Sequence, residues 1–111
     1  MITFPDDVLA AYDRSRNYIR QTPLDHSPSL SKLIKGEVYL KLENIQKTGS
    51  FKFRGAISKI TSLNTDQKNK GVVTASTGNH GAAVSLGMKI LDLNGKIVVP
   101  KNIARNKLEN I

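Results

Sequence analysis

The sequence predicts an α/β protein with an open parallel sheet in three layers, and three observations carry this prediction. Short apolar runs that alternate with polar residues, or that are rich in β-branched residues, recur at three places and are typical of strands. Segments with apolar residues at helical spacing separate these runs, so helices and strands alternate. The last two runs flank a helix, and such a unit normally forms a parallel pair through a right-handed crossover.

The first part of the chain is predicted to hold two helices and one strand. Residues 5–19 begin with Pro and two Asp and carry Arg near their end, which suits the dipole of a helix. Residues 27–36 are predicted to form a short helix that is closed by Gly36. Residues 37–43 alternate apolar and polar side chains, as expected of a half-buried strand.

A helix with an apolar stripe is predicted to begin after Ser50, its expected N-cap. The stripe consists of Phe53, Ala56, Ile57, Ile60 and Leu63. Lys52 and Arg54 fall in its first turn, at the positive end of the dipole, where each cation costs about a few tenths of a kcal/mol. Such violations of local rules are expected at functional sites, although one violation is not proof of a site.

The remainder of the chain is predicted to contain two strands with a helix between them. The expected ranges in chain order are a polar connection at 64–71, a strand at 71–76, a turn at 76–81, a helix at 82–93, a strand at 96–100 and the opening of a further helix at 102–111. Parallel sheets need cover on both faces, and three strands with their helices provide little. We therefore expect the 111 residues to be the front part of a larger protein, with a complete minimal domain as the alternative.

Composition and charge exclude several classes of protein. Cysteine is absent, so no disulfide framework and no thiolate metal site can form, and we predict no metal ligands. The chain has neither a secretion signal nor a run that approaches a membrane span, so a soluble cytoplasmic protein is expected. The net charge of +8 is spread in ones and twos without aromatic interleaving, which favours solvated faces over nucleic-acid binding.

The segment 47–56, KTGSFKFRGA, contains the first candidate site. A lysine that is partly desolvated at a helix N-terminus has its charged form destabilised. Because condensation with a carbonyl requires a neutral amine, Lys52 is a candidate Schiff-base nucleophile. The helix end also suits an anionic group of a ligand. In the alternative interpretation, Lys52 and Arg54 simply extend to solvent from an ordinary helix.

The segment 74–83, TASTGNHGAA, contains the second candidate site, between a strand end and a helix start, where open α/β sheets bind ligands. Gly78 and Gly81 allow backbone N–H groups to approach an anion. Four side chains add hydrogen-bond donors: Ser76, Thr77, Asn79 and His80. The glycines match neither the dinucleotide nor the triphosphate motif, so a carboxylate or a single phosphate is expected. In the alternative, His80 lines a turn without a chemical role, and Asn79 merely supplies a turn conformation.

Taken together, the two motifs resemble the fold-type-II pyridoxal-phosphate enzymes, in the branch of threonine/serine dehydratases and serine racemases. The resemblance rests on KLENIQKTGSFKFRGA followed by ASTGNHGAA at the family's spacing, and it extends from TPL at 22–24 to VVP at 98–100. It implies the tryptophan synthase beta-like α/β fold, incomplete here. Residues 1–66 would be the N-terminal portion of the large cofactor domain, and residues 67–111 the start of the small domain. It also implies a homodimer when the protein is complete.

The resemblance assigns roles to the two motifs. It implies that Lys52 carries pyridoxal 5'-phosphate covalently in the complete enzyme, that Phe51 lies against the cofactor ring, and that Asn79 bonds the cofactor's phenolic oxygen. The same loop would bind the α-carboxylate of the substrate through Ser76, Thr77, Gly78, Asn79 and His80. The family's phosphate loop and the partner of the pyridine nitrogen are expected beyond residue 111. This chain alone is therefore expected to bind the cofactor weakly or not at all.

The implied reaction deaminates a hydroxy amino acid, L-threonine or L-serine, to a 2-oxo acid and ammonia. Lys52 would act as the general base at Cα, while the cofactor ring stores the electrons. An amino-acid racemase of the same family is one alternative, although its racemases place a serine where Thr77 stands. A catalytically silent truncated remnant is another. The substrate stays open, since hydroxylated aspartate and diamino acids are served by similar motifs.

Overall fold

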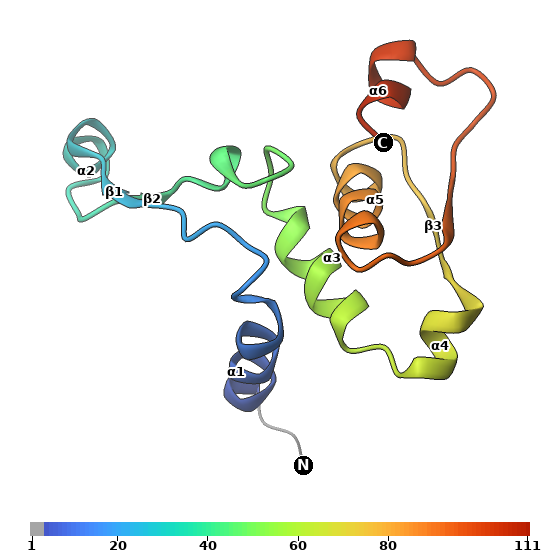
Figure 1. Ribbon diagram of the computed structural model, residues 1–111. Helices are drawn as coiled ribbons and strands as arrows, with labels where there is room; N and C mark the ends of the chain where they lie inside the picture. Colours follow the sequence, from blue (N-terminus) through green and yellow to red (C-terminus); the bar gives the residue numbers. More distant parts are fainter. Residues whose placement is uncertain (1–3) are drawn as a thin grey trace.

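The computed structural model describes residues 4–111, and its helices and strands surround a central helix, α3 (Figure 1). In chain order the elements are α1 (Phe4–Ser15), β1 (Leu24–His26), α2 (Pro28–Ile34), β2 (Tyr39–Lys41), the 3-10 turn η1 (Glu43–Ile45), α3 (Lys52–Thr61), α4 (Thr65–Lys70), β3 (Val72–Ala75), α5 (Asn79–Ile90), β4 (Gly95–Val98) and α6 (Arg105–Glu109). None of the helices in residues 4–111 combines the length and the apolar composition needed to cross a bilayer.

The core lies between α3 and α5, which pack against each other along their apolar faces. Its buried members are Phe53, Ala56, Ile57 and Ile60 of α3 and Ala83, Val84 and Met88 of α5. Phe53 and Ile57 are completely buried, so the apolar stripe predicted for α3 is confirmed over these positions. Gly87 permits the close approach of the two helices, because a Cβ there would lie 2.7 Å from Ile60 Cδ1.

Two separate two-stranded sheets stand where one parallel sheet was predicted. β3 and β4 pair in parallel, from Val72 opposite Gly95 to Ala75 opposite Val98, with α5 as their crossover, as the sequence predicts. The prediction that residues 37–43 belong to the same sheet was wrong, because β2 pairs antiparallel with β1. β1 has only three residues, which is too short for alternation to be recognised in the sequence.

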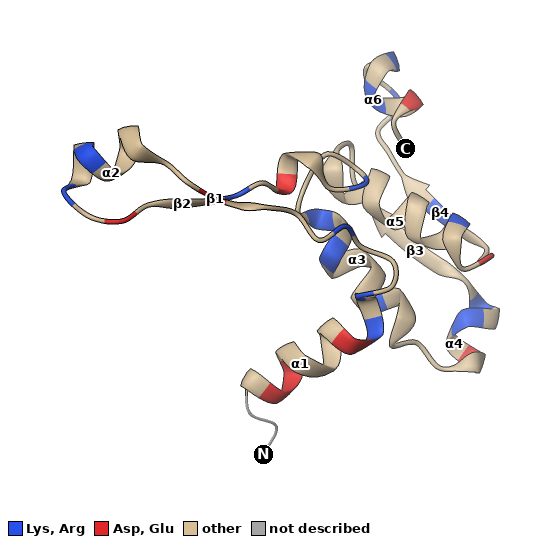
Figure 2. Ribbon diagram, turned by 60° about the vertical axis from the view of Figure 1, so that its left-hand side comes forward, with Lys and Arg blue, Asp and Glu red and all other residues tan. Residues whose placement is uncertain are grey.

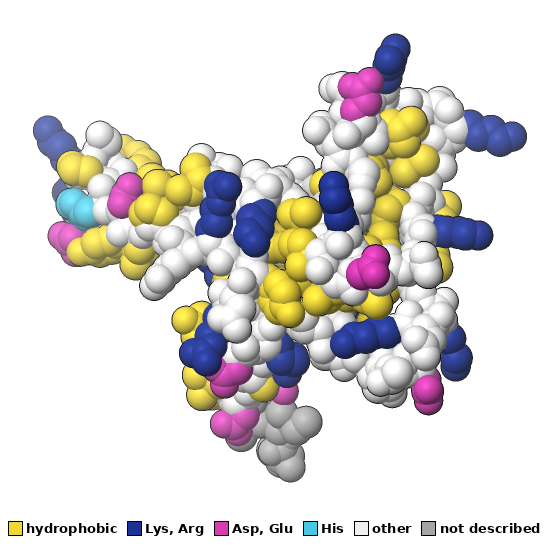
Figure 3. Space-filling view, viewed as in Figure 1, with side chains coloured by type: hydrophobic (Ala, Val, Ile, Leu, Met, Phe, Trp, Pro, Cys, Tyr) yellow, Lys and Arg dark blue, Asp and Glu magenta, His cyan; other side chains and the backbone are white. Residues whose placement is uncertain are grey.

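β1, α2 and β2 form an arm that projects away from the core (Figure 1). Every residue of β1 and β2 is exposed, so the half-buried strand predicted here was also wrong for Tyr39–Lys41. The radius of gyration is 16.8 Å, compared with about 13 Å for a compact chain of this length. Apolar side chains are accordingly exposed on the arm and around the sheets, among them Leu33, Val73 and Val98 (Figure 3).

Several predicted boundaries also differ from the structure for local reasons. α1 ends at Ser15, and residues 16–19 form a turn and a bend in place of the predicted last helical turn. The left-handed residue after α2 is Lys35, with φ 55°, and not the predicted Gly36, whose backbone N–H nevertheless donates to Ser31 O at 3.1 Å and helps to close the helix. The predicted polar connection contains α4, which begins with a reciprocal capping box between Asn64 and Gln67.

Candidate functional site

The start of α3 differs from the prediction in its cap. Phe51 occupies the N-cap position, and among residues 4–111 no side chain caps the helix, so the expected cap by Ser50 was wrong. Ser50 is 8% exposed, and its Oγ has no hydrogen-bond partner within residues 4–111. Lys52 and Arg54 lie in the first turn as predicted, and no acidic residue accompanies them there. The positive end of the dipole therefore carries two cations.

These two cations have different surroundings. Arg54 Nε donates to Glu43 Oε2 at 2.8 Å, and Arg54 Nη2 donates to Glu43 Oε1 at 2.7 Å. Lys52 is exposed, and its Nζ lies 4.8 Å from the centroid of the Phe51 ring. The expectation that Lys52 is partly desolvated is therefore wrong for this chain, and the expectation that Arg54 simply extends to solvent is wrong as well.

The paired carboxylate is strongly favoured in its ionised form. The hydrogen bonds from the Arg54 guanidinium, together with one from Thr22, lower the pKa of Glu43 from its usual 4.5 to about 2, against the opposing effect of burial. The same pairing raises the pKa of Arg54. Glu43 and Arg54 therefore stay charged at any physiological pH.

The loop that leads to Lys52 is anchored by Gln46, which is 2% exposed. Gln46 Oε1 accepts the backbone N–H of Arg20 at 2.9 Å, and Gln46 Nε2 donates to Arg20 O at 2.9 Å. Arg20 Nη1 also donates to Ile45 O at 3.0 Å. A buried side-chain amide thus satisfies backbone groups of a segment 26 residues away and fixes the path of the loop.

The second motif forms the junction between β3 and α5. Gly78 occupies the N-cap of α5, and Ser76 Oγ accepts the backbone N–H groups of Gly81 at 3.0 Å and of Gly78 at 3.3 Å. Ser76 therefore caps the helix. The predicted turn is shorter than expected, because Asn79 and His80 already belong to α5. Their backbone N–H groups have no partner within residues 4–111 and remain available to an anion.

The two motifs meet around one hollow of about 390 Å³ between α3, β3 and α5. Phe51 and Lys52 line it from α3, and Thr74 and His80 line it from the other motif. His80 Nε2 lies 3.1 Å from Thr74 Oγ1, so the imidazole is oriented by a side chain of β3. The structure therefore places Lys52, Phe51 and His80 around one hollow.

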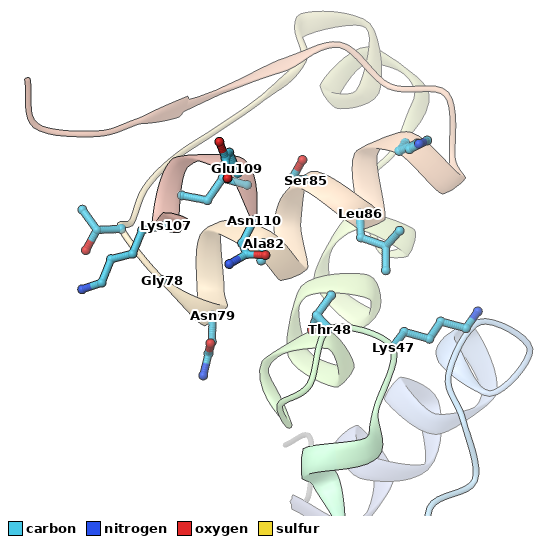
Figure 4. Close-up of a pocket in the computed structure, with 13 residues that line it drawn as sticks. Lys47, Thr48, Gly78, Asn79, Ala82, Ser85, Leu86, Lys107, Glu109 and Asn110 are labelled. Atoms are coloured by element: carbon cyan, nitrogen blue, oxygen red, sulfur yellow. The ribbon is translucent and has the colours of Figure 1, made fainter. Parts of the chain in front are cut away.

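Three of the remaining predicted residues line a neighbouring cavity of about 690 Å³. Thr77, Gly78 and Asn79 line it from the start of α5, with Lys47 and Thr48 on the opposite loop and α6 above them (Figure 4). The candidate residues are thus divided between two hollows at the start of α5, and Ser76 lines neither. No group of three or more His, Asp or Glu side chains within residues 4–111 could hold a metal ion.

Four residues that shape this region were not predicted from the sequence. They are Glu43 and Gln46, which anchor the loop, Thr48, whose buried hydroxyl has no partner within residues 4–111, and Thr74, which contacts His80. Ser50 was predicted only as a helix cap, and its buried hydroxyl likewise has no partner within these residues. All except Thr74 lie in the segment KLENIQKTGSFKFRGA. The polar residues of this segment that had been given no role could have indicated that they position the loop.

Comparisons with known proteins identify relatives across most of the chain. The catabolic L-threonine dehydratase TdcB of Escherichia coli (strain K12) is 45% identical over 103 residues, which is 93% of this chain and 31% of that protein. The L-threonine ammonia-lyase of Thermotoga maritima is 43% identical over 108 residues, which is 97% of this chain and 27% of that protein. The chain thus spans about a third of the length of these curated relatives.

A solved structure and a family match place the fold. The serine racemase of Dictyostelium discoideum superposes with a TM-score of 0.89 at 42% identity, covering 94% of this chain and 34% of that chain. The predicted fold-type-II α/β class is confirmed, and two small sheets are consistent with an incomplete domain. The family described as pyridoxal-phosphate dependent enzyme matches residues 16–111, and the chain belongs to this family.

Proposed function

We propose that the protein is a pyridoxal-phosphate-dependent dehydratase that deaminates L-threonine or L-serine to a 2-oxo acid and ammonia. Relatives named as threonine dehydratases or ammonia-lyases, 43% to 48% identical to this chain, support the proposal. The observation that carries it is that the amine of Lys52 and the imidazole of His80 line one hollow at the start of α5. A nucleophilic amine and an anion-binding helix start are the groups that amino-acid deamination requires.

The residues present fit the cofactor. Lys52 supplies the amine that the cofactor aldehyde needs, and the adjacent Phe51 ring is 60% exposed and free to lie against an aromatic ring. The buried hydroxyls of Thr48 and Ser50, in the preceding loop, lack partners that a polar ligand group or water could supply. When bound, pyridoxal phosphate supplies an electron sink for the pair left at Cα after deprotonation.

In this proposal the residues of the two motifs divide the work. Lys52 would hold the cofactor covalently until the amine of the substrate displaces it, and the freed amine of Lys52 would then remove the Cα proton of the substrate as general base. Phe51 would support the cofactor ring, and the Asn79 amide would donate a hydrogen bond to the cofactor's phenolic oxygen. The loop from Ser76 to His80, with Thr77 and Gly78, binds the substrate carboxylate through the unpartnered N–H groups at the start of α5.

The structure adds one refinement to these roles. Ser76 Oγ is engaged with two backbone N–H groups of its own loop, so we assign it the shaping of the carboxylate site. Residues 1–66 are proposed to belong to the large cofactor domain and residues 67–111 to the small domain. The proposed complete enzyme is a cytoplasmic homodimer whose further residues cover the apolar surface that is exposed here.

Racemisation by the same site is the second candidate, because solved serine racemases match this chain with TM-scores of 0.88 and 0.89. Thr77 decides between the two candidates in our proposal, since it carries a hydroxyl but adds a methyl group where the family's racemases have serine. The dehydratase is therefore favoured, and a Thr77→Ser variant should gain racemisation of serine at the expense of deamination.

The experiment uses the native-length protein, that is, the whole chain that its own gene encodes, loaded with pyridoxal phosphate. Ammonia and 2-oxo acid are measured with L-threonine and L-serine, and the yellow cofactor colour is followed by absorbance. Lys52→Ala should abolish both, whereas Lys70→Ala, on the exposed face of α4, should retain both. Ammonia release by Lys52→Ala at the wild-type rate would refute the proposal, and inactivity of the loaded wild type on both substrates would favour a silent remnant.

A further inference from the structure

Glu43 and Arg54 form a two-pronged ion pair that ties the first turn of α3 to η1, where an acidic segment lies beside basic turns of the helix (Figure 2). Thr22 Oγ1 also donates to Glu43 Oε1, so three donors meet one carboxylate. The Arg54 and Glu43 side chains are only 32% and 15% exposed. Bidentate pairs in such partly shielded settings fix orientation as well as distance.

The pair compensates an unfavourable charge at the start of α3. The first turn carries Lys52 and Arg54, has no acidic residue and has no side-chain cap. Cations at the positive end of a helix dipole destabilise the turn that holds them. The carboxylate of Glu43 supplies the missing negative charge from outside the helix, and it therefore stabilises the turn that begins with Lys52.

The segment before Lys52 is held at its other end by Gln46, through the paired hydrogen bonds with the backbone of Arg20. Residues 47–51 between these two attachments belong to no helix or strand. The position of Lys52 therefore depends on the attachment before it, at Gln46, and on two after it, the buried ring of Phe53 and the ion pair of Arg54. Neither Glu43 nor Arg54 lines the hollow that Lys52 lines, so any influence on Lys52 passes through the backbone of α3.

We infer that Glu43 and Arg54 are positioning residues for Lys52. Their two-pronged contact sets the orientation of the first turn of α3 and hence the place from which the Lys52 amine meets pyridoxal phosphate. The inference rests on the proposed function of Lys52 and adds to it two residues that touch neither cofactor nor substrate.

The test compares two variants of the native-length protein with one matched control. Glu43→Gln keeps the shape of the side chain and removes its charge, whereas Arg54→Lys keeps the charge and removes the fork. Glu37→Gln removes the charge of another ion-paired glutamate, whose Oε2 lies 3.3 Å from His26 Nε2 at an exposed position on the arm, and Glu37 lines neither hollow. All proteins are first shown to be folded by far-UV circular dichroism.

Three quantities are measured. Borohydride trapping of pyridoxal phosphate on Lys52, located by mass spectrometry across a pH series, should slow about tenfold in both variants. The circular dichroism that the protein induces in the bound cofactor should be weaker in both variants. A loss of global stability alone does not weaken this signal while the protein stays folded. Amide exchange in the first turn of α3, without cofactor, should accelerate about tenfold. Glu37→Gln should match the wild type in all three.

The outcomes separate this inference from the function on which it rests. The inference is overturned, and the proposed function is left standing, if folded Glu43→Gln and Arg54→Lys equal the loaded wild type in trapping rate and in induced circular dichroism. A wild type that takes no pyridoxal phosphate on Lys52 overturns the proposed function and the inference with it. If Glu43→Gln does not fold, Arg54→Lys, which preserves the net charge, decides between these outcomes.

Discussion

Replacement of Gly95 by alanine should strongly destabilise the protein, because the backbone at this position leaves no room for a Cβ. An added Cβ would overlap Val72 O and Met88 Sδ and would lie 3.1 Å from Val72 C. Val72 is the register partner of Gly95, so β3 has to move away from β4. Overpacking costs about 1–3 kcal/mol, and each weakened ladder hydrogen bond adds about 1 kcal/mol. The expected loss is therefore about 3 kcal/mol.

Gly55→Ala is the matched control, with the opposite expected sign. Gly55 lies in the interior of α3, is exposed, and an added Cβ there meets nothing within 4 Å. Alanine should therefore stabilise the helix by about 0.5–1 kcal/mol. Urea unfolding of the native-length protein, followed by circular dichroism and extrapolated linearly, measures both variants. A Gly95→Ala variant as stable as Gly55→Ala would refute the steric reasoning.

Three further substitutions test the ion pair, the cap and the core. Because the pKa of Glu43 is depressed from 4.5 to about 2, its pairing with Arg54 stabilises the fold fully above pH 4.5, and this stability is lost as the pH falls through 2. Urea titrations should show the wild type more stable than Glu43→Gln by about 1–3 kcal/mol at pH 7. The two free energies of unfolding should become equal as the pH falls to about 2. Asn64→Ala, which removes the capping box of α4, should cost about 1 kcal/mol and lower the thermal midpoint. Phe53→Ala, at a completely buried position, should cost about 3–5 kcal/mol in urea unfolding, and a loss below about 1 kcal/mol would contradict the assignment of the core.

The parts of the fold that sequence predicts well are those fixed by local periodicity. The apolar residues of α3 recur at helical spacing and therefore lie on one face, and this is the face that packs against α5 in the core. The parallel pairing of β3 and β4 follows from the crossover rule once α5 separates them. The capping box of Asn64 and Gln67 was also readable in the sequence, and α4 was missed because its residues are polar on every face.

The parts that sequence did not predict depend on contacts between distant residues. The strand at β2 was predicted, but its partner β1 was not, because three residues are too short to show a recognisable strand pattern. Ser50 has the chemistry of an N-cap, yet the anchoring of Gln46 to Arg20 sets the entry of the chain, and the helix begins two residues later. Likewise, Glu43 and Arg54 are 11 residues apart, and only the turn at η1 brings them together.

The two cations at the start of α3 show how one violation of the dipole rule can have two meanings. Arg54 pairs with the carboxylate of Glu43, and its charge thereby helps to hold the first turn of α3 in place. Among residues 4–111, the Lys52 amine contacts only the face of the Phe51 ring, a contact worth about 0.5–1 kcal/mol at an exposed site. A carboxylate beside Lys52 would form an ion pair that has to break before the amine could react. In the described part of the chain, the cation that fixes the turn is thus paired with a carboxylate, and the cation from which covalent chemistry is proposed is not.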